Sequence, residues 1–434
     1  MTTRIASVAV GAWLIGLTSA LGQQAYAQAQ LAAPPGPLGQ PANAQPQPMA
    51  PSAAVGQTAD AQTPLAAPPA PNWWASADAL AWGVKSAPLP VPTLTTFTPG
   101  SPSATTGFGG QLGVPGTSVL SPDHFGYGIM PGAHFTLGRW LDNDPSWGVE
   151  GEGFFLSSGT ANFSASSSGM PSLRVPFNNV PPGDGFPLGS SSFVLADPGF
   201  AIGSQIINSS LQFWGAEGNA LYRAYDNGPY HLSLLGGFRY LDLREGLSIT
   251  SNETVTPAGS PFPGTFTAFD KFETRNLFFG GQIGAKAQAQ FGQFDGSLLA
   301  KVALGDIDQT VITSGSSAST GFGVPSITAP GGIFTQTTNI GQQSHNAFTA
   351  VPEAQVELGY SLPYGIRVSL AYDFIYLGNV VRPGNQIDTT LNFTSNPVIS
   401  GPGVAASGAA RPEPMFTKST FWAQGIKLGL TYKF

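Results

Sequence analysis

The residue types that most often perform catalysis or bind metals are scarce in this chain. It has no cysteine and four histidines, namely His124, His134, His231 and His345. No two histidines are two or four residues apart, the spacings that put two ligands on one face of a strand or a helix. The chain also lacks the Gly-x-Ser-x-Gly and His-Glu-x-x-His motifs and a phosphate-binding glycine loop before a helix. We therefore predict no catalytic residues, no metal site and no cofactor.

Two weaker candidates for chemistry have simpler interpretations. His134 lies on the predicted inner face of its strand and could pair with an aspartate, but a histidine in a polar network is the commoner arrangement. Asp306 and Asp308 could contact a divalent ion, yet two carboxylates at this spacing usually mark a solvated strand end. A barrel hydrolase or acyltransferase is thus a remote third hypothesis.

The remaining polar residues recur at every second position. Glu353, Gln355 and Glu357 alternate with apolar residues, a period of two that is typical of a strand with two different faces. Burying three such groups side by side in a dry core would be costly. A barrel in lipid reverses the usual arrangement, with its apolar face outward and its polar face toward the lumen.

Ten segments show this alternation, and joins of two lengths connect them. The predicted strands are residues 73–84, 124–141, 146–157, 210–224, 229–243, 272–288, 294–310, 345–361, 365–379 and 417–434. Short turns alternate strictly with the long segments 85–123, 158–209, 244–271, 311–344 and 380–416. Short periplasmic turns and long extracellular loops are typical of outer-membrane barrels.

We therefore predict an all-β fold, a single-chain transmembrane antiparallel up-and-down β-barrel. Ten strands place both termini on the periplasmic side. Twelve strands are the alternative, because 244–256 and 262–271 could either add a strand pair or extend a long hairpin above the membrane. Most strands exceed the roughly 9–11 residues that a tilted crossing needs, so the wall is expected to project beyond the bilayer.

The composition agrees with this class. Only 9% of residues are charged, against about 25% in ordinary globular domains. No apolar run of about 18 residues follows the N-terminal region, which excludes a bundle of membrane helices. The net charge is −7 without a basic run, so we expect no nucleic-acid partner.

The first 71 residues differ from the rest. Residues 1–27 have the pattern of a signal peptide, with Arg4, an apolar stretch and the cleavage motif Ala25-Tyr26-Ala27. Residues 28–71 are rich in Pro, Ala and Gln and predict a disordered periplasmic linker. It is either a plain spacer or a tether to a cell-wall or periplasmic partner. The barrel is assigned to residues 72–434.

The C-terminal residues form a second signal, for barrel assembly. Apolar residues alternate with polar or small ones up to a final aromatic residue, at Leu428, Leu430, Tyr432 and Phe434. We interpret them as the insertion signal for the barrel-assembly machinery, which would follow passage through the export translocon. Outer-membrane lipid is the third expected partner.

Several segments resemble the family of bacterial outer-membrane proteins known as beta-barrel porin seven. The resemblance spans about residues 73–434. It rests on Phe135-Thr-Leu-Gly-Arg-Trp140, Trp147-Gly-Val-Glu-Gly151, Leu234-Leu-Gly-Gly-Phe-Arg-Tyr240, Thr274-Arg-Asn-Leu-Phe-Phe-Gly-Gly-Gln282, Lys301-Val-Ala-Leu-Gly305, Tyr372-Asp-Phe-Ile-Tyr376, Asn379-Val-Val-Arg-Pro-Gly384 and Phe421-Trp-Ala-Gln-Gly425. It implies an outer-membrane barrel and implies no substrate.

The predicted lumen is therefore the candidate functional site. Its predicted lining is Glu150, Glu152, Glu217, Asn219, Arg239, Lys286, Asp295, Lys301, Glu353, Gln355, Glu357, Arg367, Asp373 and Lys427. If water passes between these groups, the acidic excess predicts a mild cation preference. If they pair across the lumen, they plug it. Ten strands lie near the number whose interior side chains already fill, and the long segment 158–209 could fold inward.

Two functions remain open. The first is a narrow porin-like channel for passive diffusion of small solutes or ions. The second is a non-conducting structural barrel that displays its extracellular loops or anchors the envelope. Both place the protein in the bacterial outer membrane.

Overall fold

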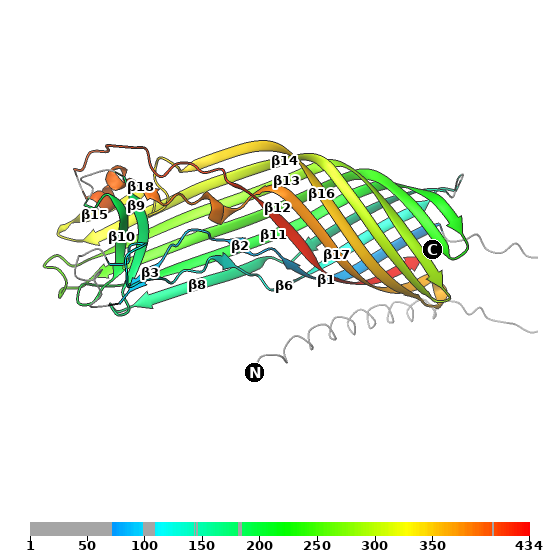
Figure 1. The fold of residues 1–434 in the computed structure, drawn as a ribbon, viewed down its shortest axis with the longest axis horizontal. Coiled ribbons are helices and arrows are strands. Elements are labelled where there is room, and N and C mark those ends of the chain that lie inside the picture. Colours follow the sequence, from blue (N-terminus) through cyan, green and yellow to red (C-terminus); the bar gives the residue numbers. More distant parts are fainter. Residues whose placement is uncertain (1–71, 99–108, 143, 145, 181–184, 402) are drawn as a thin grey trace, which may run out of the picture. The chain divides into compact units, whose positions relative to one another are not determined.

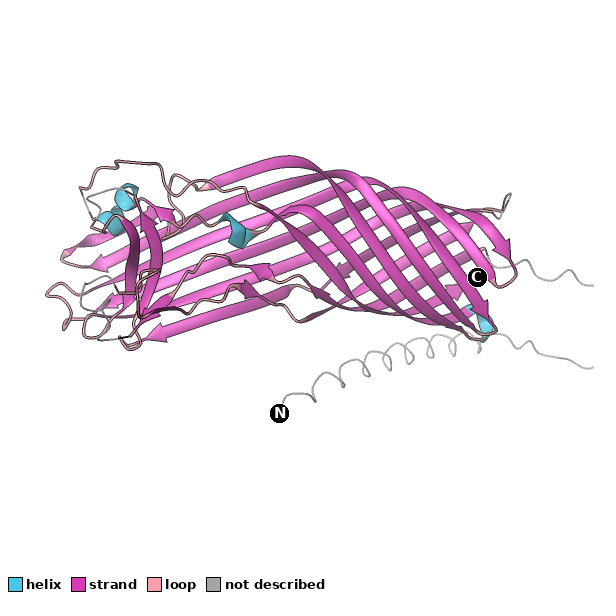
Figure 2. Cartoon of the chain, viewed as in Figure 1, coloured by secondary structure: helices cyan, strands magenta, loops and turns pink. Residues whose placement is uncertain are grey.

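Ten antiparallel strands form a closed ring in the computed structural model, which describes residues 72–98, 109–142, 144, 146–180, 185–401 and 403–434 (Figures 1 and 2). Each strand pairs with the next along the chain, and β1 pairs with β19 to close the ring. The ring strands are β1 (Trp73–Val84), β6 (Ile129–Trp140), β7 (Trp147–Leu156), β11 (Ala201–Asn227), β12 (Tyr230–Val255), β13 (Gly264–Phe291), β14 (Phe294–Gly321), β16 (Gly341–Ser361), β17 (Ile366–Val381) and β19 (Lys418–Lys433).

The remaining elements follow the ring in the long joins. Two of them extend its sheet, since β8 (Gly159–Ser167) pairs with β11 and β15 (Val324–Pro330) pairs with β14. The others are β2 (Ala87–Pro88), β3 (Thr95–Phe97), β4 (Thr117–Val119), β5 (His124–Phe125), β9 (Leu173–Asn179), β10 (Gly189–Ala196), η1 (Pro363–Gly365), η2 (Pro383–Gln386), β18 (Thr390–Leu391), η3 (Phe393–Ser395) and α3 (Pro397–Ser400).

The all-β barrel prediction is confirmed, and ten strands close its ring. The segments 244–256 and 262–271 lengthen the hairpin of β12 and β13, whose register runs unbroken from Tyr230↔Ala289 to Val255↔Gly264. The segment 158–209, predicted as one long loop, instead contains β8, β9, β10 and the first residues of β11. Its residues form strands because the sheet continues past the short apolar band described next.

An apolar band covers the outer wall at the end of the barrel where β1 starts and β19 finishes, here called the terminal end. On β7 the band runs from Trp147 to Phe155, and on β11 from Tyr222 to Trp214, all of them exposed. Each of these stretches matches the roughly 9–11 residues that a tilted strand uses to cross a bilayer. The outer wall of this half therefore has the dimensions of a lipid-facing surface.

The outward face changes character farther along the same strands, toward what we call the loop end. On β12 the exposed Leu234 and Phe238 and the half-buried Tyr240 are followed, on the same face, by Asp242 and Arg244. The change occurs where aromatic residues gather, since the rings of Trp214 and Tyr240 lie 5.1 Å apart. Because Trp and Tyr prefer the headgroup level of a bilayer, this line marks the edge of the lipid-facing band.

The inward face changes in the opposite sense at the same line of aromatic residues. On the terminal-end side of this line, β12 points the charged Arg239 inward. On the loop-end side, its buried inward residues are Leu241, Leu243, Leu247 and Ile249. The strands are therefore apolar outside and polar inside within the band, and polar outside and apolar inside beyond it. The second arrangement is that of a water-soluble protein.

The part beyond the line is a packed head, which we define as the loop-end portions of β11 to β14 together with β3, β4, β8 to β10, β15 and β18. A second sheet, in the order β10-β9-β3-β4, packs its apolar side chains on the inner face of the long strands. Val175 and Phe177 of β9 are buried against Ile207, Ile249 and other inward residues. The long joins thus fill the ring at the loop end (Figure 1).

The predicted signal peptide and linker lie outside the described residues. No helix within the described ranges has both the length and the apolar content that a membrane span requires.

Candidate functional site

The inward positions of the apolar half carry the charged side chains. Strand alternation puts every second residue on the inner face, so a charge two residues from another on one strand points the same way. The structure places all of the sequence-predicted lining residues at inward, buried or half-buried positions. They are Glu150 and Glu152 on β7, Glu217 and Asn219 on β11, Arg239 on β12, Lys286 on β13, Asp295 and Lys301 on β14, Glu353, Gln355 and Glu357 on β16, Arg367 and Asp373 on β17, and Lys427 on β19.

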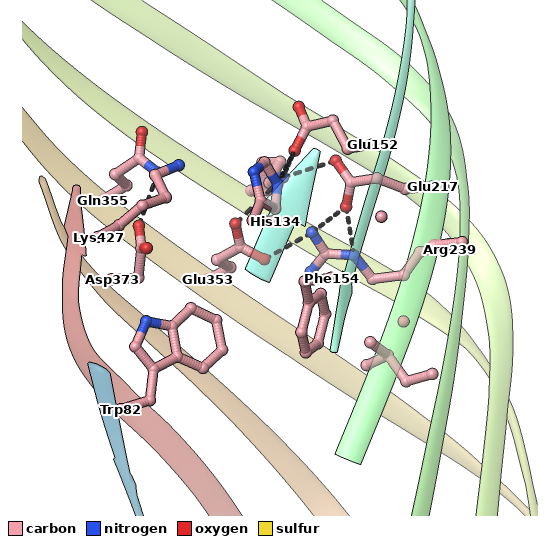
Figure 3. Close-up of a pocket in the computed structure, with 15 residues that line it drawn as sticks. Trp82, His134, Glu152, Phe154, Glu217, Arg239, Glu353, Gln355, Asp373 and Lys427 are labelled. Atoms are coloured by element: carbon pink, nitrogen blue, oxygen red, sulfur yellow. Dashed lines mark hydrogen bonds and ion pairs between the residues drawn. The ribbon is translucent and has the colours of Figure 1, made fainter. Parts of the chain in front are cut away.

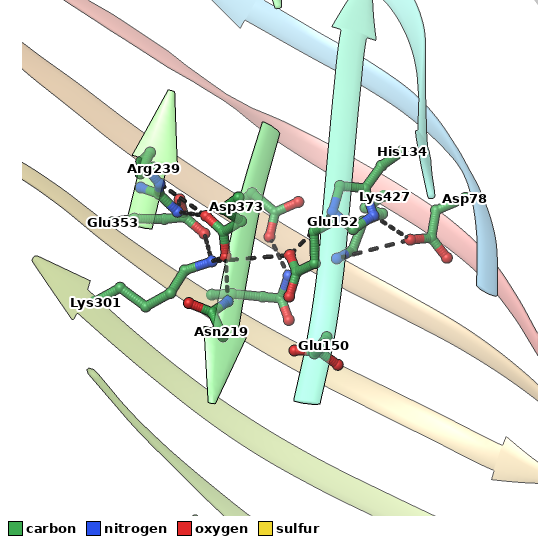
Figure 4. Close-up of polar contacts among 12 residues, drawn as sticks. Asp78, His134, Glu150, Glu152, Asn219, Arg239, Lys301, Glu353, Asp373 and Lys427 are labelled. Atoms are coloured by element: carbon green, nitrogen blue, oxygen red, sulfur yellow. Dashed lines mark hydrogen bonds and ion pairs between the residues drawn. The ribbon is translucent and has the colours of Figure 1, made fainter. Parts of the chain in front are cut away.

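Four of these residues form an ion-pair group across the lumen (Figure 4). The Lys301 ammonium lies 2.6 Å from Glu217 and 3.1 Å from Glu353. The Arg239 guanidinium lies 2.6 Å from Glu353, and its Nε donates to Glu217 at 2.8 Å. Lys301 also approaches Glu152, on β7, at 3.8 Å. In the ring, β7 and β14 stand four strands apart, so the group bridges opposite walls.

A second group joins the strands that close the ring. The two ring nitrogens of His134 lie 2.7 Å from Asp78 and 3.2 Å from Glu152. Lys427 lies 3.9 Å from Asp78. Because Glu152 contacts both His134 and Lys301, it connects this group to the first. The two groups together are called the charged network below.

A third group lies closer to the terminal end. The Nε of Arg367 donates to Asp295 at 2.9 Å, and its Nη2 lies 2.8 Å from Glu357. Nearer the network, the Gln355 amide donates to Asp373 at 2.6 Å. These contacts link β17 to β16 and, across β16, to β14, so the interior is bound together at several heights.

Three other predicted residues have their own contacts or positions. Trp74 Nε1 donates to Glu150 at 3.0 Å, and Gln282 of β13 donates to Asn219 at 2.6 Å. Lys286 occupies a half-buried inward position of β13. The predicted lining is therefore polar and largely hydrogen-bonded at every height of the apolar half.

Little free volume remains within the network. A void of about 30 Å³ lies among Trp82, His134, Glu217 and Arg239 (Figure 3). It has room for about two water molecules, since one molecule needs roughly 10–15 Å³ of such space. The side chain of Lys301 is only 2% exposed. At this level the described side chains fill the ring.

An apolar layer covers the network on its loop-end side. Aromatic rings form most of it, with Trp82 and Phe154 5.4 Å apart, Phe154 and Phe213 5.2 Å apart, and Phe213 and Phe421 5.1 Å apart. Ions avoid such a layer because it offers no group to replace their hydration.

A buried ion pair lies above that layer. Arg382, which precedes η2, donates from Nε to Glu245 at 2.9 Å, and neither side chain is exposed. Its Nη1 donates to the Ser86 carbonyl at 2.8 Å, and its Nη2 to the Lys85 carbonyl at 3.2 Å. Arg382 thus fastens the join after β17 to β12 and to the join after β1, inside the ring.

Sequence reasoning missed several of these residues. Asp78 could have been found, because it alternates with alanines in the first predicted strand. Gln282 could have been found in the same way. Glu245 and Arg382 gave no signal of an inward position, because both lie in segments that were predicted to be loops. Asp306 and Asp308 stand at outward positions of β14, at the edge of the apolar band.

The comparison with protein families identifies a family of barrels. The family described as "Putative beta barrel porin-7 (BBP7)" matches residues 74–434. No curated protein matches the chain.

Three solved structures match the chain at low identity. The outer membrane protease OmpT from Escherichia coli has 9% identity and a TM-score of 0.35, with 84% of this chain and 97% of that chain covered. The Pseudomonas putida toluene transporter TodX has 9% identity and a TM-score of 0.23, with 85% and 91% covered. A Pseudomonas aeruginosa FadL homologue has 9% identity and a TM-score of 0.25, with 84% and 91% covered. TM-scores this low carry no argument about activity.

The family match covers the closed ring, its charged network and the packed head together, so this chain is an outer-membrane β-barrel that belongs to the beta barrel porin-7 family.

Proposed function

We propose that the protein is a closed outer-membrane barrel whose function is structural: it holds a rigid head above the membrane and lets no solute through in this state. The observation that carries the proposal is the charged network. Lys301 contacts carboxylates from β7, β11 and β16, so its ion pairs cross the space through which a solute would pass. Separating these buried pairs would cost several kcal/mol (about 3–5 for one broken pair).

Two further layers support the closed interior. The aromatic layer of Trp82, Phe154, Phe213 and Phe421 lies above the network. The pair of Arg382 and Glu245 and the core of the head lie above that layer. A solute would have to displace all three layers, whose chemistries differ.

The orientation and the assembly partners belong to the same proposal. Trp73 and Phe434 exchange backbone hydrogen bonds of 3.0 Å, so both ends of the barrel segment lie together. We place this terminal end in the periplasm, where the linker could contact a cell-wall or periplasmic partner, and the head outside the cell. Leu428, Leu430 and Tyr432 point outward, about half exposed, which suits their proposed role as an assembly signal.

The second candidate is the narrow diffusion channel, which the description of the family as a porin favours. Acidic lining residues would then give a mild cation preference. Catalysis remains the third, remote candidate. Loss of a measured turnover in His134→Ala would be needed to support it.

Single-channel conductance distinguishes the first two candidates. The folded barrel, inserted in a planar bilayer at several salt concentrations, is expected to stay silent. Its insertion is verified by flotation with vesicles and by the shifted gel migration of a folded barrel. Steady, salt-dependent openings would overturn the closed-barrel proposal, and a lowered cation preference in Glu353→Gln would then assign the channel to this lumen.

A further inference from the structure

A recess in the outer wall lies directly beyond the edge of the apolar band. It measures about 380 Å³ and spans β11 to β14. Most of its lining consists of outward residues, among them Ser210 and Gln212 on β11, Arg244 and Gly246 on β12, and Glu273 and Arg275 on β13. We call it the outer recess.

Two arginines dominate the outer recess. Arg244 and Arg275 are direct register partners on β12 and β13, with side chains 50% and 43% exposed. Like charges directly opposite each other in a sheet are destabilising. Within the part of the chain that the structure describes, one carboxylate contacts both arginines: Asp242, itself fully buried, lies 2.8 Å from Arg244 and 2.7 Å from Arg275. The single negative charge of Asp242 thus pairs with two positive charges, which leaves one positive charge in excess.

Holding Asp242 does not use all the donors of the two arginines. Arg244 and Arg275 each use Nε and Nη2 to hold Asp242. A guanidinium has five N–H donors, so among the described residues the Nη1 side of Arg244 remains for another acceptor, while Arg275 also hydrogen-bonds with Tyr240. Two adjacent guanidiniums that are held in place suit the oxygens of a phosphate, which arginine binds through paired hydrogen bonds.

The height of the recess determines which phosphate can reach it. Tyr240 and Phe279 stand four residues closer to the apolar band than Arg244 and Arg275 on the same outward faces, and Trp214 stands two residues closer than Gln212. Aromatic residues of this kind mark the headgroup level of a bilayer. Arg244 and Arg275 therefore lie just beyond the aromatic line, where their long side chains can reach a lipid phosphate whose acyl chains lie against the apolar band below.

Other outward charges limit the site. Lys271 is paired with Glu273 at 2.9 Å. Asp306 and Asp308, on β14, are outward residues that lie toward the apolar band. Their negative charge stands beside Arg275 on the membrane side, so the headgroup is expected to reach the arginines along β11 and β12, past Trp214 and Tyr240. The absence of a side chain on Gly246 keeps the far end of the recess open for the phosphate, because a Cβ there would stand 2.8 Å from the Ser210 hydroxyl.

We infer that the outer recess binds the phosphate of a membrane lipid from the leaflet that surrounds the head, through Arg244 and Arg275. The site depends on the outer-membrane location and is independent of whether the lumen conducts.

Lipid retention tests the inference. The full chain is placed in nanodiscs of phosphatidylcholine with a minor share of phosphatidic acid, and bound lipid is counted by native mass spectrometry after release. We expect the wild type to retain phosphatidic acid. The double variant Arg244→Gln/Arg275→Gln should retain at least roughly tenfold less of it. Lys271→Gln is the matched control, since it removes a positive charge from the same face but outside the recess, and it should retain the lipid. Equal retention by all three proteins would overturn the site.

A second variant guards against misfolding, because Asp242 loses both partners in the double variant. Ser210→Phe fills the recess and leaves both arginines paired, and it should also lose the lipid. Retention by Ser210→Phe equal to the wild type would count against the recess. Inorganic phosphate titrated against nanodiscs of phosphatidylcholine alone distinguishes the source. Tight, arginine-dependent binding of free phosphate without retention of phosphatidic acid would overturn a lipid ligand.

Discussion

Lys301 is the residue whose surroundings say most about the interior. It reaches carboxylates from three strands while only 2% exposed. Removing one partner from such a group leaves the others buried without compensation. We predict that Lys301→Met lowers the free energy of unfolding by about 3–5 kcal/mol, measured by urea titration in lipid vesicles. Lys271→Met removes an exposed ion pair and should cost at most about 1 kcal/mol. A similar cost for both variants would show that the network is not the main constraint in the lumen.

The residue scale also shows what the sequence allowed. The alternation of side chains between the two faces of a strand was sufficient to place Glu217, Arg239 and Lys301 on the inner face. Their contacts could not be predicted. Which carboxylate contacts which cation depends on the register between strands. The alternation within one strand carries no information about that register.

At the scale of elements, Arg382 anchors the first residues of the join that contains η2. Arg382 satisfies Glu245 and two backbone carbonyls inside the ring. We predict that Arg382→Met increases hydrogen exchange in residues 380–391 by a factor of at least about ten, since a buried carboxylate would lose its partner. The double variant Arg382→Met/Glu245→Leu should recover most of the protection. Failure of the double variant to recover would assign the effect to the lost carbonyl contacts.

The head has its own dependence on pH. Glu253, near the end of β12 and beyond the apolar band, is buried close to Arg174, and burial raises its pKa to about 8. In the unfolded chain its pKa is about 4.3. The native head therefore keeps a neutral Glu253 while the unfolded segment ionises, so its stability is greatest below about pH 4.3 and falls as the pH rises toward 8. Exchange protection of the β9 amides, corrected for the intrinsic pH effect, should be higher at pH 5 than at pH 8.5. Glu253→Gln should remove this part of the difference.

The strand predictions succeeded in the apolar half and failed in the head for the same reason. The predicted strand limits at 210 and 243 follow the pattern of apolar residues on the outward face, and this pattern does end near Tyr240. The strand continues because the opposite face becomes apolar, at Leu241, Leu243 and Leu247. Alternation predicts a strand whether its apolar residues face outward or inward. Only apolar residues that face outward were expected of a barrel in lipid. The apolar half could therefore be predicted, and the head could not.

At the scale of the whole molecule, the outward face of a single strand contacts lipid along one part and water along another. Ile283 and Thr267 are both outward on β13, and Ile283 is 65% exposed within the apolar band. An arginine facing the middle of a bilayer costs about 2–4 kcal/mol, and nearly nothing near or beyond its surface. We predict that Ile283→Arg lowers the free energy of unfolding in vesicles by this amount, while Thr267→Arg changes it by less than about 1 kcal/mol. Equal effects would mean that the bilayer does not end at the line of aromatic residues.

The pairing of Trp73 with Phe434 has a consequence for how the molecule forms. These residues, 73 and 434 in the sequence, are hydrogen-bonded to each other, and the β1–β19 pairing that they extend makes the sheet a ring. Contacts between such distant parts of a chain form late, because the whole intervening segment must first be confined. Until then β1 and β19 are bare edges whose backbone groups have no partner in hydrocarbon. The intermediate with nine paired seams is thus unsuited to lipid, and formation of the tenth seam commits the barrel to the membrane.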